Sequence, residues 1–457
     1  MEHAARVVRA ERLQGPVHVP VAIVGGGACG LTAAIALRAT GIDCVVLERD
    51  AKTSGSTALS SGFIPAAGTQ VQHALGIADS PEAFAADILH KSRGTAAAHL
   101  VQAYTQAAAP ALDALAAHGL RFEVLTNFLY PGHGVHRMHT LPQRTGASLV
   151  AALLAAAQAA GADLLTSARV TELWADAGDR ILGVGVERPG GAIERIGCDV
   201  LLLACNGFGG NRRLVHELLP EMRAATFAGH AGNDGSAILW GRQLGAALED
   251  LGGYQGHGSW VVPQGALMTW AVMMEGGVQL NARGERFHDE TQGYSEAAVA
   301  VLAQPGGIAW NVFGERQLAL AREFPDFREA EAAGALRTAA AREGLARIIG
   351  CDAAALPAEI ARFGPPFHAV RVTGALFHTQ GGLDIDAQCR VRRVDGSVFP
   401  NLLAAGGAAR GVSGNAVWGY LSGNGLLGAV AGGWIAAHTA IAGVALRSTA
   451  SLPVRAS

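Results

Sequence analysis

The chain has 457 residues and a formal net charge of -3, and half of its residues are hydrophobic. A chain of this length and composition can bury a large core and is expected to divide into two or three domains. Because it has no basic block and no apolar signal segment near its start, we expect neither a nucleic-acid partner nor export. Its six cysteines stand singly, without a C-x-x-C pair, which predicts a cytoplasmic protein without haem or an iron–sulfur cluster.

The first predicted element is a strand that ends in a glycine-rich turn. Residues 19–24 precede the triplet Gly25, Gly27 and Gly30, and a second strand ends in Glu48. In a dinucleotide site the first glycine permits the tight turn, the second lets backbone N–H groups approach a pyrophosphate, and the third lets the helix pack on the strand. We therefore predict such a site, with Glu48 accepting hydrogen bonds from a ribose. The alternative is a glycine-rich turn without a ligand.

The residue composition and the hydrophobic pattern then change twice along the chain. Up to about residue 225, short apolar strands alternate with Ala-rich helices, for example over 81–118 and 146–160, as in an α/β domain. From about residue 229 to 373, Gly/Trp/Met-rich segments lead into a charged stretch with helical spacing, residues 316–347. Short strands and glycine turns return afterwards. This order predicts an α/β domain, residues 1–228 and 374–457, interrupted by a second domain over 229–373.

One apolar stretch is long enough to be considered as a membrane span. Residues 425–446 carry no charge, but they include five glycines and His438, and their apolar residues are mostly alanine. We therefore predict a buried helix that packs through glycine and alanine, and no integral membrane segment.

Three histidines gather in residues 132–139. His133, His136 and His139 resemble a metal site at first sight, but no acid or cysteine at suitable spacing completes it. We predict a polar loop near the cofactor, with a metal site as the alternative.

Four segments together resemble one protein family: residues 54–62, 202–207, 378–382 and 400–407. With the first glycine turn, they are similar to the FAD-dependent succinate dehydrogenase/fumarate reductase flavoproteins, a superfamily that includes 3-ketosteroid dehydrogenases. The resemblance implies a Rossmann-like FAD-binding domain of the glutathione reductase type, interrupted by an inserted α+β capping and catalytic domain. No second fingerprint for NAD(P)H is present.

The resemblance also implies which residues hold FAD. They are Gly25, Gly27, Ala28, Gly30, Glu48, Arg49, Ser54, Gly55, Ser56, Thr57, Ser61, Gly62, Val170, Ala204, Asn206, Gly207, His378, Gly406, Gly407, Gly423, Asn424 and Leu426. Covalently flavinylated relatives have a histidine where this chain reads Ser56 and Thr57, so FAD should be bound noncovalently. Relatives usually place an acid for the ribityl chain at Gly407, so that contact must be replaced or lost.

The substrate positions depart from those of the fumarate reductases. Tyr294 stands in the place of their proton-donating arginine, Tyr420 in that of a clamp arginine, and Phe377 in that of a substrate histidine. Only His257 matches the family's remaining substrate histidine. Because a buried dicarboxylate needs cations, this pattern indicates a neutral carbonyl compound and most resembles the 3-ketosteroid dehydrogenases.

That resemblance implies a role for each residue. Tyr294 abstracts a proton alpha to a ketone, Tyr420 and the N–H of Asn424 polarise the ketone oxygen, and Tyr130 is a further partner. For each tyrosine the alternative is a side chain that merely anchors a loop, and His257 is equally a candidate packing histidine.

Three functions follow as hypotheses. The first is an FAD-dependent dehydrogenase that introduces a C=C bond next to a ketone, either a ketosteroid or a smaller cyclic ketone, and passes electrons to an external acceptor. The second is a fumarate-reductase-like ene-reductase of an unsaturated acid. The third is a non-catalytic FAD-binding protein.

Overall fold

The computed structural model describes residues 5–15 and 17–450. The chain forms two compact units, each described by itself below. Unit 1 consists of Met1–Asn211, Gly229–Gly253 and His378–Ser457, and unit 2 consists of Arg212–Ala228 and Tyr254–Phe377.

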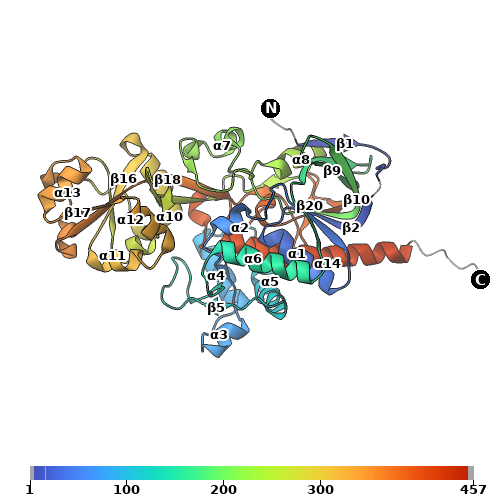
Figure 1. The fold of residues 1–457 in the computed structure, drawn as a ribbon, viewed down its shortest axis with the longest axis horizontal. Helices are drawn as coiled ribbons and strands as arrows, with labels where there is room; N and C mark the ends of the chain where they lie inside the picture. Colours follow the sequence, from blue (N-terminus) through green and yellow to red (C-terminus); the bar gives the residue numbers. More distant parts are fainter. Residues whose placement is uncertain (1–4, 16, 451–457) are drawn as a thin grey trace, which may run out of the picture. The chain divides into compact units, whose positions relative to one another are not determined.

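Unit 1 is built on a nine-stranded sheet in the order β1-β8-β9-β10-β2-β3-β7, with β21 beside β10 and β20 beside β21 (Figure 1). Its strands are β1 (Arg6–Arg9), β2 (Val17–Val24), β3 (Cys44–Leu47), β7 (Asp163–Leu165), β8 (Arg169–Ala175), β9 (Ile181–Glu187), β10 (Ile193–Leu203), β20 (Arg390–Arg392) and β21 (Val398–Ala404). The run β21-β10-β2-β3-β7 is parallel, whereas β8, β9 and β10 form an antiparallel meander. The central parallel strands are buried on both faces, which explains their continuous Val, Ile and Leu runs.

The helices of unit 1 are α1 (Ala28–Ala39), α2 (Gly55–Leu59), α3 (Gln70–Ala74), α4 (Pro81–Lys91), α5 (Ala98–Ala117), α6 (Gly146–Ala159), α8 (Ser236–Leu244) and α14 (Asn424–Ala450). Of these, α1, α8 and α14 contact strands of the sheet. The smaller strands of unit 1 are β4 (Ile64–Pro65), β5 (Glu123–Val124), β6 (Met138–Thr140), β12 (Leu248–Glu249) and β19 (Gly382–Leu383). The predicted α/β fold with a parallel sheet is therefore confirmed.

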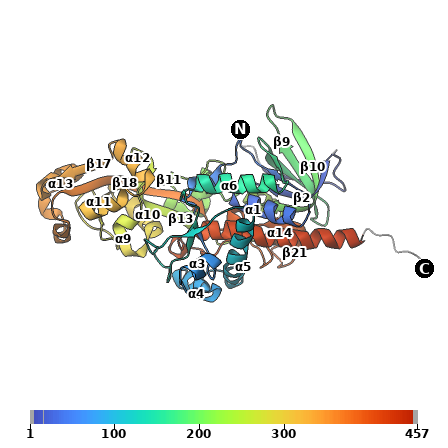
Figure 2. The same cartoon turned by 60° about the horizontal axis from the view of Figure 1, so that its bottom comes forward.

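Helix α14 lies alongside α1 in both views (Figures 1 and 2). A Cβ atom on Gly433 would lie 2.4 Å from the carbonyl oxygen of Cys29, so the two helices approach closely only because glycine stands there. Among the described residues α14 is the one helix long and apolar enough to cross a membrane, and 39% of its apolar window is buried. Length and composition alone are weak evidence for a span, and the tight packing on α1 agrees with the predicted Gly/Ala-packed helix.

Residues 229–253 belong to unit 1, although the sequence pattern suggested that the second domain begins at residue 229. In this segment β12 pairs with β19, with Leu248 opposite Leu383, and Arg49 donates a hydrogen bond to the carbonyl of Gly232 at 2.8 Å. Conversely, residues 212–228 belong to unit 2, because Thr226 pairs with Ala375. Such pairings between distant segments leave no mark in local composition.

Unit 2 contains a seven-stranded sheet in the order β14-β13-β18-β16-β15, with β11 and β17 also on β18. Its strands are β11 (Thr226–Phe227), β13 (Tyr254–Val261), β14 (Ala266–Leu267), β15 (Val278–Leu280), β16 (Ile308–Phe313), β17 (Leu336–Ala339) and β18 (Phe367–Thr379), the last of which continues into unit 1. Its helices are α7 (Arg212–Leu218), α9 (Ala271–Met274), α10 (Tyr294–Leu302), α11 (Glu315–Ala321), α12 (Pro325–Ala332) and α13 (Arg342–Ile349).

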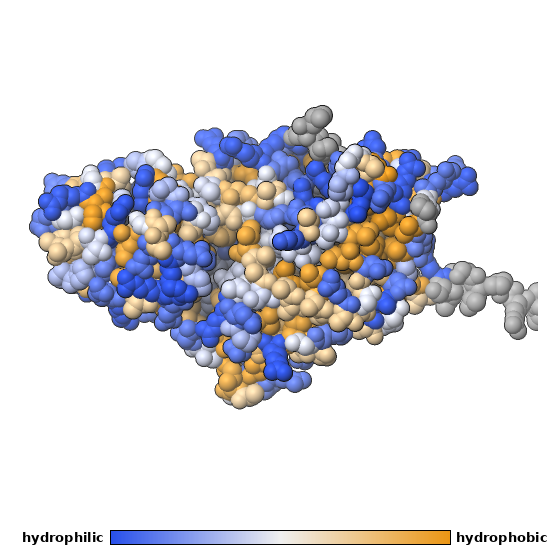
Figure 3. Space-filling view, viewed as in Figure 1, coloured by the Kyte–Doolittle hydropathy of each residue, from blue (hydrophilic) through white to orange (hydrophobic). Residues whose placement is uncertain are grey.

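Two features of unit 2 bear on the sequence prediction. The charged stretch 316–347 forms helices α11 to α13, whose surface carries many hydrophilic side chains (Figure 3). It also contains β17, which the helical spacing did not reveal. Helix α10 packs closely on β13. A Cβ atom on Gly258 would be only 2.6 Å from that of Ala297, so this close approach requires a glycine. This contact fixes the start of α10 next to the middle of β13.

Candidate functional site

The predicted dinucleotide turn connects β2 to α1. Gly25 has a φ of +114°, and a Cβ atom on it would lie 2.4 Å from the carbonyl oxygen of Ala204. A Cβ atom on Gly30 would lie 2.0 Å from the carbonyl oxygen of Gly25. At Gly27, which caps the N-terminus of α1, the nearest atom would be Thr57 Oγ1 at 3.4 Å. The fold thus requires Gly25 and Gly30, whereas Gly27 leaves room for a ligand at the helix N-terminus.

Glu48 follows β3 and is 8% exposed. Its Oε2 accepts a hydrogen bond from the N–H of Gly26 and its Oε1 one from the N–H of Asp50, each at 2.9 Å. Burial raises the pKa of Glu48, and these two N–H groups partly oppose that shift. Each carboxylate oxygen retains acceptor capacity for a ribose hydroxyl. Neighbouring Arg49 is bound to Asp234, with Nη1 3.0 Å from Oδ2.

Helix α2 is fastened to the glycine turn and to the end of β10. The Oγ of Ser56 accepts hydrogen bonds from the side-chain amides of Asn206 at 2.8 Å and Asn233 at 2.9 Å. Thr57 Oγ1 accepts from the N–H of Ala28 at 3.0 Å. Asn233 was missed in the sequence, where nothing marks it as a partner of a residue 177 positions earlier.

The missing acid at Gly407 has a structural reason. Asn206 Oδ1 accepts the N–H of Gly207 at 2.8 Å, and a Cβ atom on Gly407 would lie only 2.1 Å from that oxygen. With Asn206 in this place, a side chain at position 407 would collide with it. The departure from the family pattern therefore has a local steric cause, because the side chain of Asn206 fills the space beside Gly407.

The other residues predicted at the cofactor also lie in unit 1. Ser54 is the N-cap residue of α2, Gly55 begins that helix, and Ser61 and Gly62 follow it. Val170 is in β8, and Ala204 directly follows β10. Gly406 has a φ of +60°, Gly423 precedes α14, and Leu426 lies in the first turn of α14.

Four buried or half-buried polar side chains form a chain of hydrogen bonds that ends on His378. Asn424 Nδ2 donates to Ser413 Oγ at 2.9 Å, Ser413 Oγ donates to Gln380 Oε1 at 2.8 Å, and Gln380 Nε2 lies 3.1 Å from His378 Nδ1. The same Nδ1 also lies 3.4 Å from the carbonyl oxygen of Thr379. Burial lowers the pKa of His378 to about 4, so the ring is neutral at pH 7.

Tyr420 packs beside this chain. Its ring lies edge-on to that of His378, with centroids 5.5 Å apart. Burial raises the pKa of Tyr420, while the backbone N–H groups of Gly425 and Gly423 act to lower it, so its phenol is a neutral donor at pH 7. The Oδ1 atom of Asn424 is buried and has no hydrogen-bond partner among the described residues.

Unit 2 contains a second aromatic cluster. His257 is 4% exposed, and its ring stacks on that of Tyr294 at a centroid distance of 4.8 Å and an angle of 14°. Trp270 and Phe377 lie 5.8 and 5.7 Å from the same imidazole. Burial lowers the pKa of His257 to about 3, and its Nδ1 accepts the N–H of Ser259 at 3.1 Å. The imidazole is therefore neutral, with its hydrogen on Nε2.

Tyr130 lies in unit 1, between the rings of Phe63 and Phe128 at 5.9 and 5.0 Å, and burial raises its pKa. Its nearest ring partners are thus aromatic, and its proposed contact with a substrate stays a prediction.

The histidine-containing loop 132–139 is held by an arginine. Arg137 is 1% exposed and forms ion pairs with Asp79 and Asp87, while His139 lies 2.7 Å from Thr69 Oγ1. Within residues 5–15 and 17–450, no group of three or more His, Cys, Asp and Glu side chains could hold a metal ion. The loop is polar, as predicted. The two acids that pair with its arginine, Asp79 and Asp87, lie outside residues 132–139.

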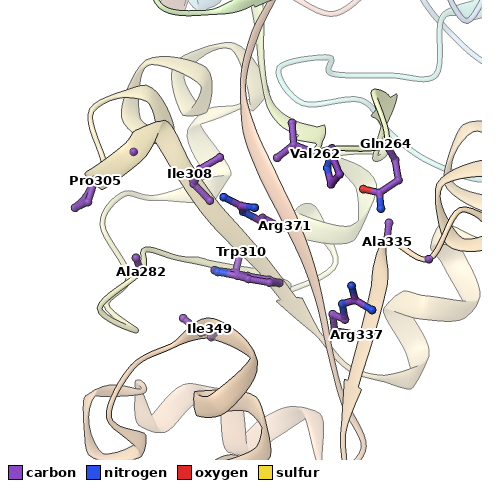
Figure 4. Close-up of a pocket in the computed structure, with 13 residues that line it drawn as sticks. Val262, Gln264, Ala282, Pro305, Ile308, Trp310, Ala335, Arg337, Ile349 and Arg371 are labelled. Carbon is purple, nitrogen blue, oxygen red and sulfur yellow. The ribbon is translucent and has the colours of Figure 1, made fainter.

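A hollow of about 450 Å³ opens in unit 2 (Figure 4). Its lining includes Trp310, Arg337 and Arg371, and Trp310 pairs across the strands with Arg371. None of the predicted site residues lines it, so it does not enter the function proposed below.

Comparison with known proteins agrees with this geometry. The FAD binding domain family model matches residues 20–426. The fumarate reductase (cytochrome) of Shewanella frigidimarina is 26% identical over 420 residues, which covers 87% of this chain and 73% of that protein.

Two solved structures share the fold. The open conformation of a flavocytochrome c3 fumarate reductase has a TM-score of 0.81 at 24% identity, covering 94% of this chain and 79% of that one. The 3-ketosteroid-Δ4-(5α)-dehydrogenase of Rhodococcus jostii RHA1 has a TM-score of 0.75 at 22% identity, covering 95% and 99%.

The residues present fit FAD. Gly27 leaves the N-terminus of α1 open for a pyrophosphate, and Glu48 keeps acceptor capacity for a ribose hydroxyl. The buried Oδ1 of Asn424 has no hydrogen-bond partner within residues 5–15 and 17–450. The chain belongs to the FAD-binding flavoprotein family of the succinate dehydrogenases and fumarate reductases, and it is an FAD-dependent oxidoreductase.

Proposed function

We propose that this flavoprotein oxidises a ketone by removing hydrogen from the carbons alpha and beta to the carbonyl, so that a C=C bond forms. The substrate is a ketosteroid or a smaller cyclic ketone. One observation supports this most strongly: each of the two candidate tyrosines packs on a histidine, buried His257 or half-buried His378, whose pKa is lowered to about 3 or 4. Neutral imidazoles and phenols suit an uncharged carbonyl, whereas a dicarboxylate requires cations to offset its desolvation.

Tyr294 is the base in this proposal and takes the alpha proton. It is the first residue of α10, and the positive end of the helix dipole favours negative charge in the first turn. The neutral ring of His257 stacks on the phenol and holds its plane. Tyr294 thereby meets the two needs of a phenolic base, a fixed direction and a stabilised anion.

Tyr420 and the N–H of Asn424 donate hydrogen bonds to the ketone oxygen, which becomes negative as the alpha proton leaves. Burial keeps the Tyr420 phenol protonated, and the edge contact with His378 restrains its ring. FAD, held at the glycine turn and at Glu48, would supply the hydride acceptor for the beta carbon and the link to an external electron acceptor. Tyr130 is a further candidate for the substrate wall.

A second candidate function is reduction of an unsaturated acid. The name of the Shewanella relative, fumarate reductase, favours it. It conflicts with the tyrosines at the two arginine positions, because a carboxylate buried without a cation is strongly disfavoured.

Anaerobic mixing distinguishes the two functions. The FAD-loaded protein is mixed with a 3-ketosteroid, cyclohexanone or succinate while flavin absorbance is followed. We expect bleaching by a ketone and none by succinate. Reoxidation of the prereduced protein by fumarate or urocanate, without any response to ketones, would replace the proposal with the second candidate.

A further inference from the structure

The loop that carries His133 lies against the loop that carries Tyr420, both in unit 1. His133 is 6% exposed, and its Nε2 lies 2.9 Å from the carbonyl oxygen of Ser422. A Cβ atom on Gly132 would lie 2.7 Å from Cδ1 of Leu421. The two loops therefore touch at consecutive positions on each side.

Buried ion pairs fix the loop of His133. Arg137 donates from Nε and Nη2 to the two carboxylate oxygens of Asp79, each at 3.0 Å, and from Nη1 to Asp87 at 2.5 Å. Asp87, which lies in α4, also accepts the N–H of Gly134 at 2.7 Å. Because Asp79 and Arg137 are almost fully buried, breaking their ion pair is energetically costly. These ion pairs of Arg137 are called the anchor of the loop below.

Arg137 also sets the tautomer of His133. Its Nη1 lies 3.5 Å from Nδ1 of the imidazole, and a guanidinium can only donate. Burial lowers the pKa of His133 to about 4, so the ring is neutral and has a single N–H. With Nδ1 facing a donor, the hydrogen is on Nε2 and is donated to the carbonyl of Ser422.

We propose that His133 is a positioning residue, which acts by holding the carbonyl of Ser422 and thereby the segment 420–424. The inference rests on the proposed function insofar as Tyr420 and the N–H of Asn424 bind the ketone oxygen there. The ion pairs of Arg137 hold the imidazole of His133, and that imidazole holds the carbonyl of Ser422. Ser422 lies between Tyr420 and Asn424 in the sequence. A donor that must meet a developing charge has to be held within a few tenths of an ångström.

Hydrogen exchange of the FAD-loaded protein tests the anchor without a substrate. His133→Leu removes the donor, whereas His133→Gln places an amide nitrogen where Nε2 lies. We expect amides 422–424 to exchange about tenfold faster in His133→Leu, which corresponds to the loss of one buried hydrogen bond, and near the wild-type rate in His133→Gln. His133→Asn, whose amide is too short to reach Ser422, serves if the leucine variant does not fold.

His139→Leu is the matched control, because His139 is a buried histidine in β6, directly after the same loop, and bonds to Thr69 instead. Equal exchange of residues 422–424 in His133→Leu and His139→Leu would overturn the inference, since it would indicate general loosening. Unchanged exchange in both would overturn it as well. With a ketone substrate, His133→Leu should lower kcat about tenfold and His133→Gln should restore it. If ketones fail to bleach the wild-type flavin, the exchange result still decides the anchor, so the two failures are distinguishable.

Discussion

At the scale of single residues, the proposed function gives two phenols different roles because their surroundings differ. Tyr294 begins a helix and stacks on a neutral imidazole, which suits a base, whereas Tyr420 is buried beside His378 and stays protonated, which suits a donor. Both assignments follow from the environment of the side chain rather than from the residue type.

Replacement of either phenol by phenylalanine keeps the ring packing and removes the oxygen. We expect Tyr420→Phe to lower kcat about 100- to 1000-fold, as for the loss of one oxyanion donor. Tyr294→Phe, which removes the base, should lower it about 100- to 10,000-fold. Tyr104→Phe is the control, because Tyr104 is buried in the core of unit 1 and has no role in the proposed reaction. Stopped-flow measurement of flavin reduction checks all three; a wild-type rate in Tyr294→Phe would exclude it as the base.

The ion pair between Arg137 and Asp79 allows a prediction on stability. The side chains are 1% and 0% exposed, so removal of the carboxylate takes the acceptors from two buried N–H groups of Arg137 and leaves Asp87 as its remaining ion-pair partner. Asp79→Ala should therefore lower the free energy of unfolding by about 3 to 5 kcal/mol. Glu331→Ala, which breaks the exposed pair with Arg322, should lower it by less than about 1 kcal/mol. Urea unfolding measures both, and similar losses in the two variants would contradict the argument.

At the scale of elements, two glycines of the turn between β2 and α1 should affect different properties: one the binding of FAD, the other the folding of the apoprotein. Gly27→Ala meets only Thr57 Oγ1 at 3.4 Å, so the apoprotein should keep its melting temperature while FAD binding weakens at least about tenfold. Gly30→Ala would place its methyl carbon 2.0 Å from a carbonyl oxygen and should destabilise the apoprotein itself. Thermal unfolding and FAD titration distinguish these outcomes. Equal FAD affinity in Gly27→Ala and wild type would show that the pyrophosphate lies elsewhere.

Elements with a strong local signal were predicted well from sequence. The glycine turn after β2 and the apolar helix α14 were both expected, because their glycines serve contacts within or beside the same element. Strand β17 was missed: its four residues stand in a charged stretch and form a strand only because they pair with β18. Local patterns do not report such long-range pairing.

For the candidate site, the sequence indicated single residues but not the hydrogen bonds that hold them. The resemblance indicated Ser56 and His378, yet their hydrogen-bond partners Asn233 and Gln380 were not singled out. The ion pairs of Arg137 were also missed, because Asp79 and Asp87 lie 58 and 50 residues away in the chain. Which polar groups meet in the interior depends on tertiary structure, and one sequence does not contain that information in readable form.

At the scale of the whole molecule, buried histidines make stability depend on pH. The pKa values of His133, His139 and His378 are lowered to about 4 and that of His257 to about 3, in each case chiefly by burial. In the unfolded chain these groups titrate near the usual value of about 6.5. Between about pH 6.5 and pH 4 the unfolded state therefore binds more protons, and the free energy of unfolding falls as the pH is lowered.

Urea unfolding at several pH values measures this effect. Each fully neutral histidine should contribute a slope of up to about 1.4 kcal/mol per pH unit within that window and none above about pH 7. His133→Gln should flatten the slope by about one histidine's share. Stability that does not change between about pH 7 and pH 5 would show that these rings have the same pKa in the folded and the unfolded protein.

The order of segments in the two units has a practical consequence for cutting the protein apart. A continuous fragment 212–377 would carry α8 and β12 away from their partners in unit 1, and would leave Trp240, now 1% exposed, facing water. A fragment that starts at Tyr254 would instead lack β11, whose Thr226 pairs with Ala375. To express unit 2 alone, residues 212–228 should therefore be joined to residues 254–377 by a short linker that replaces residues 229–253.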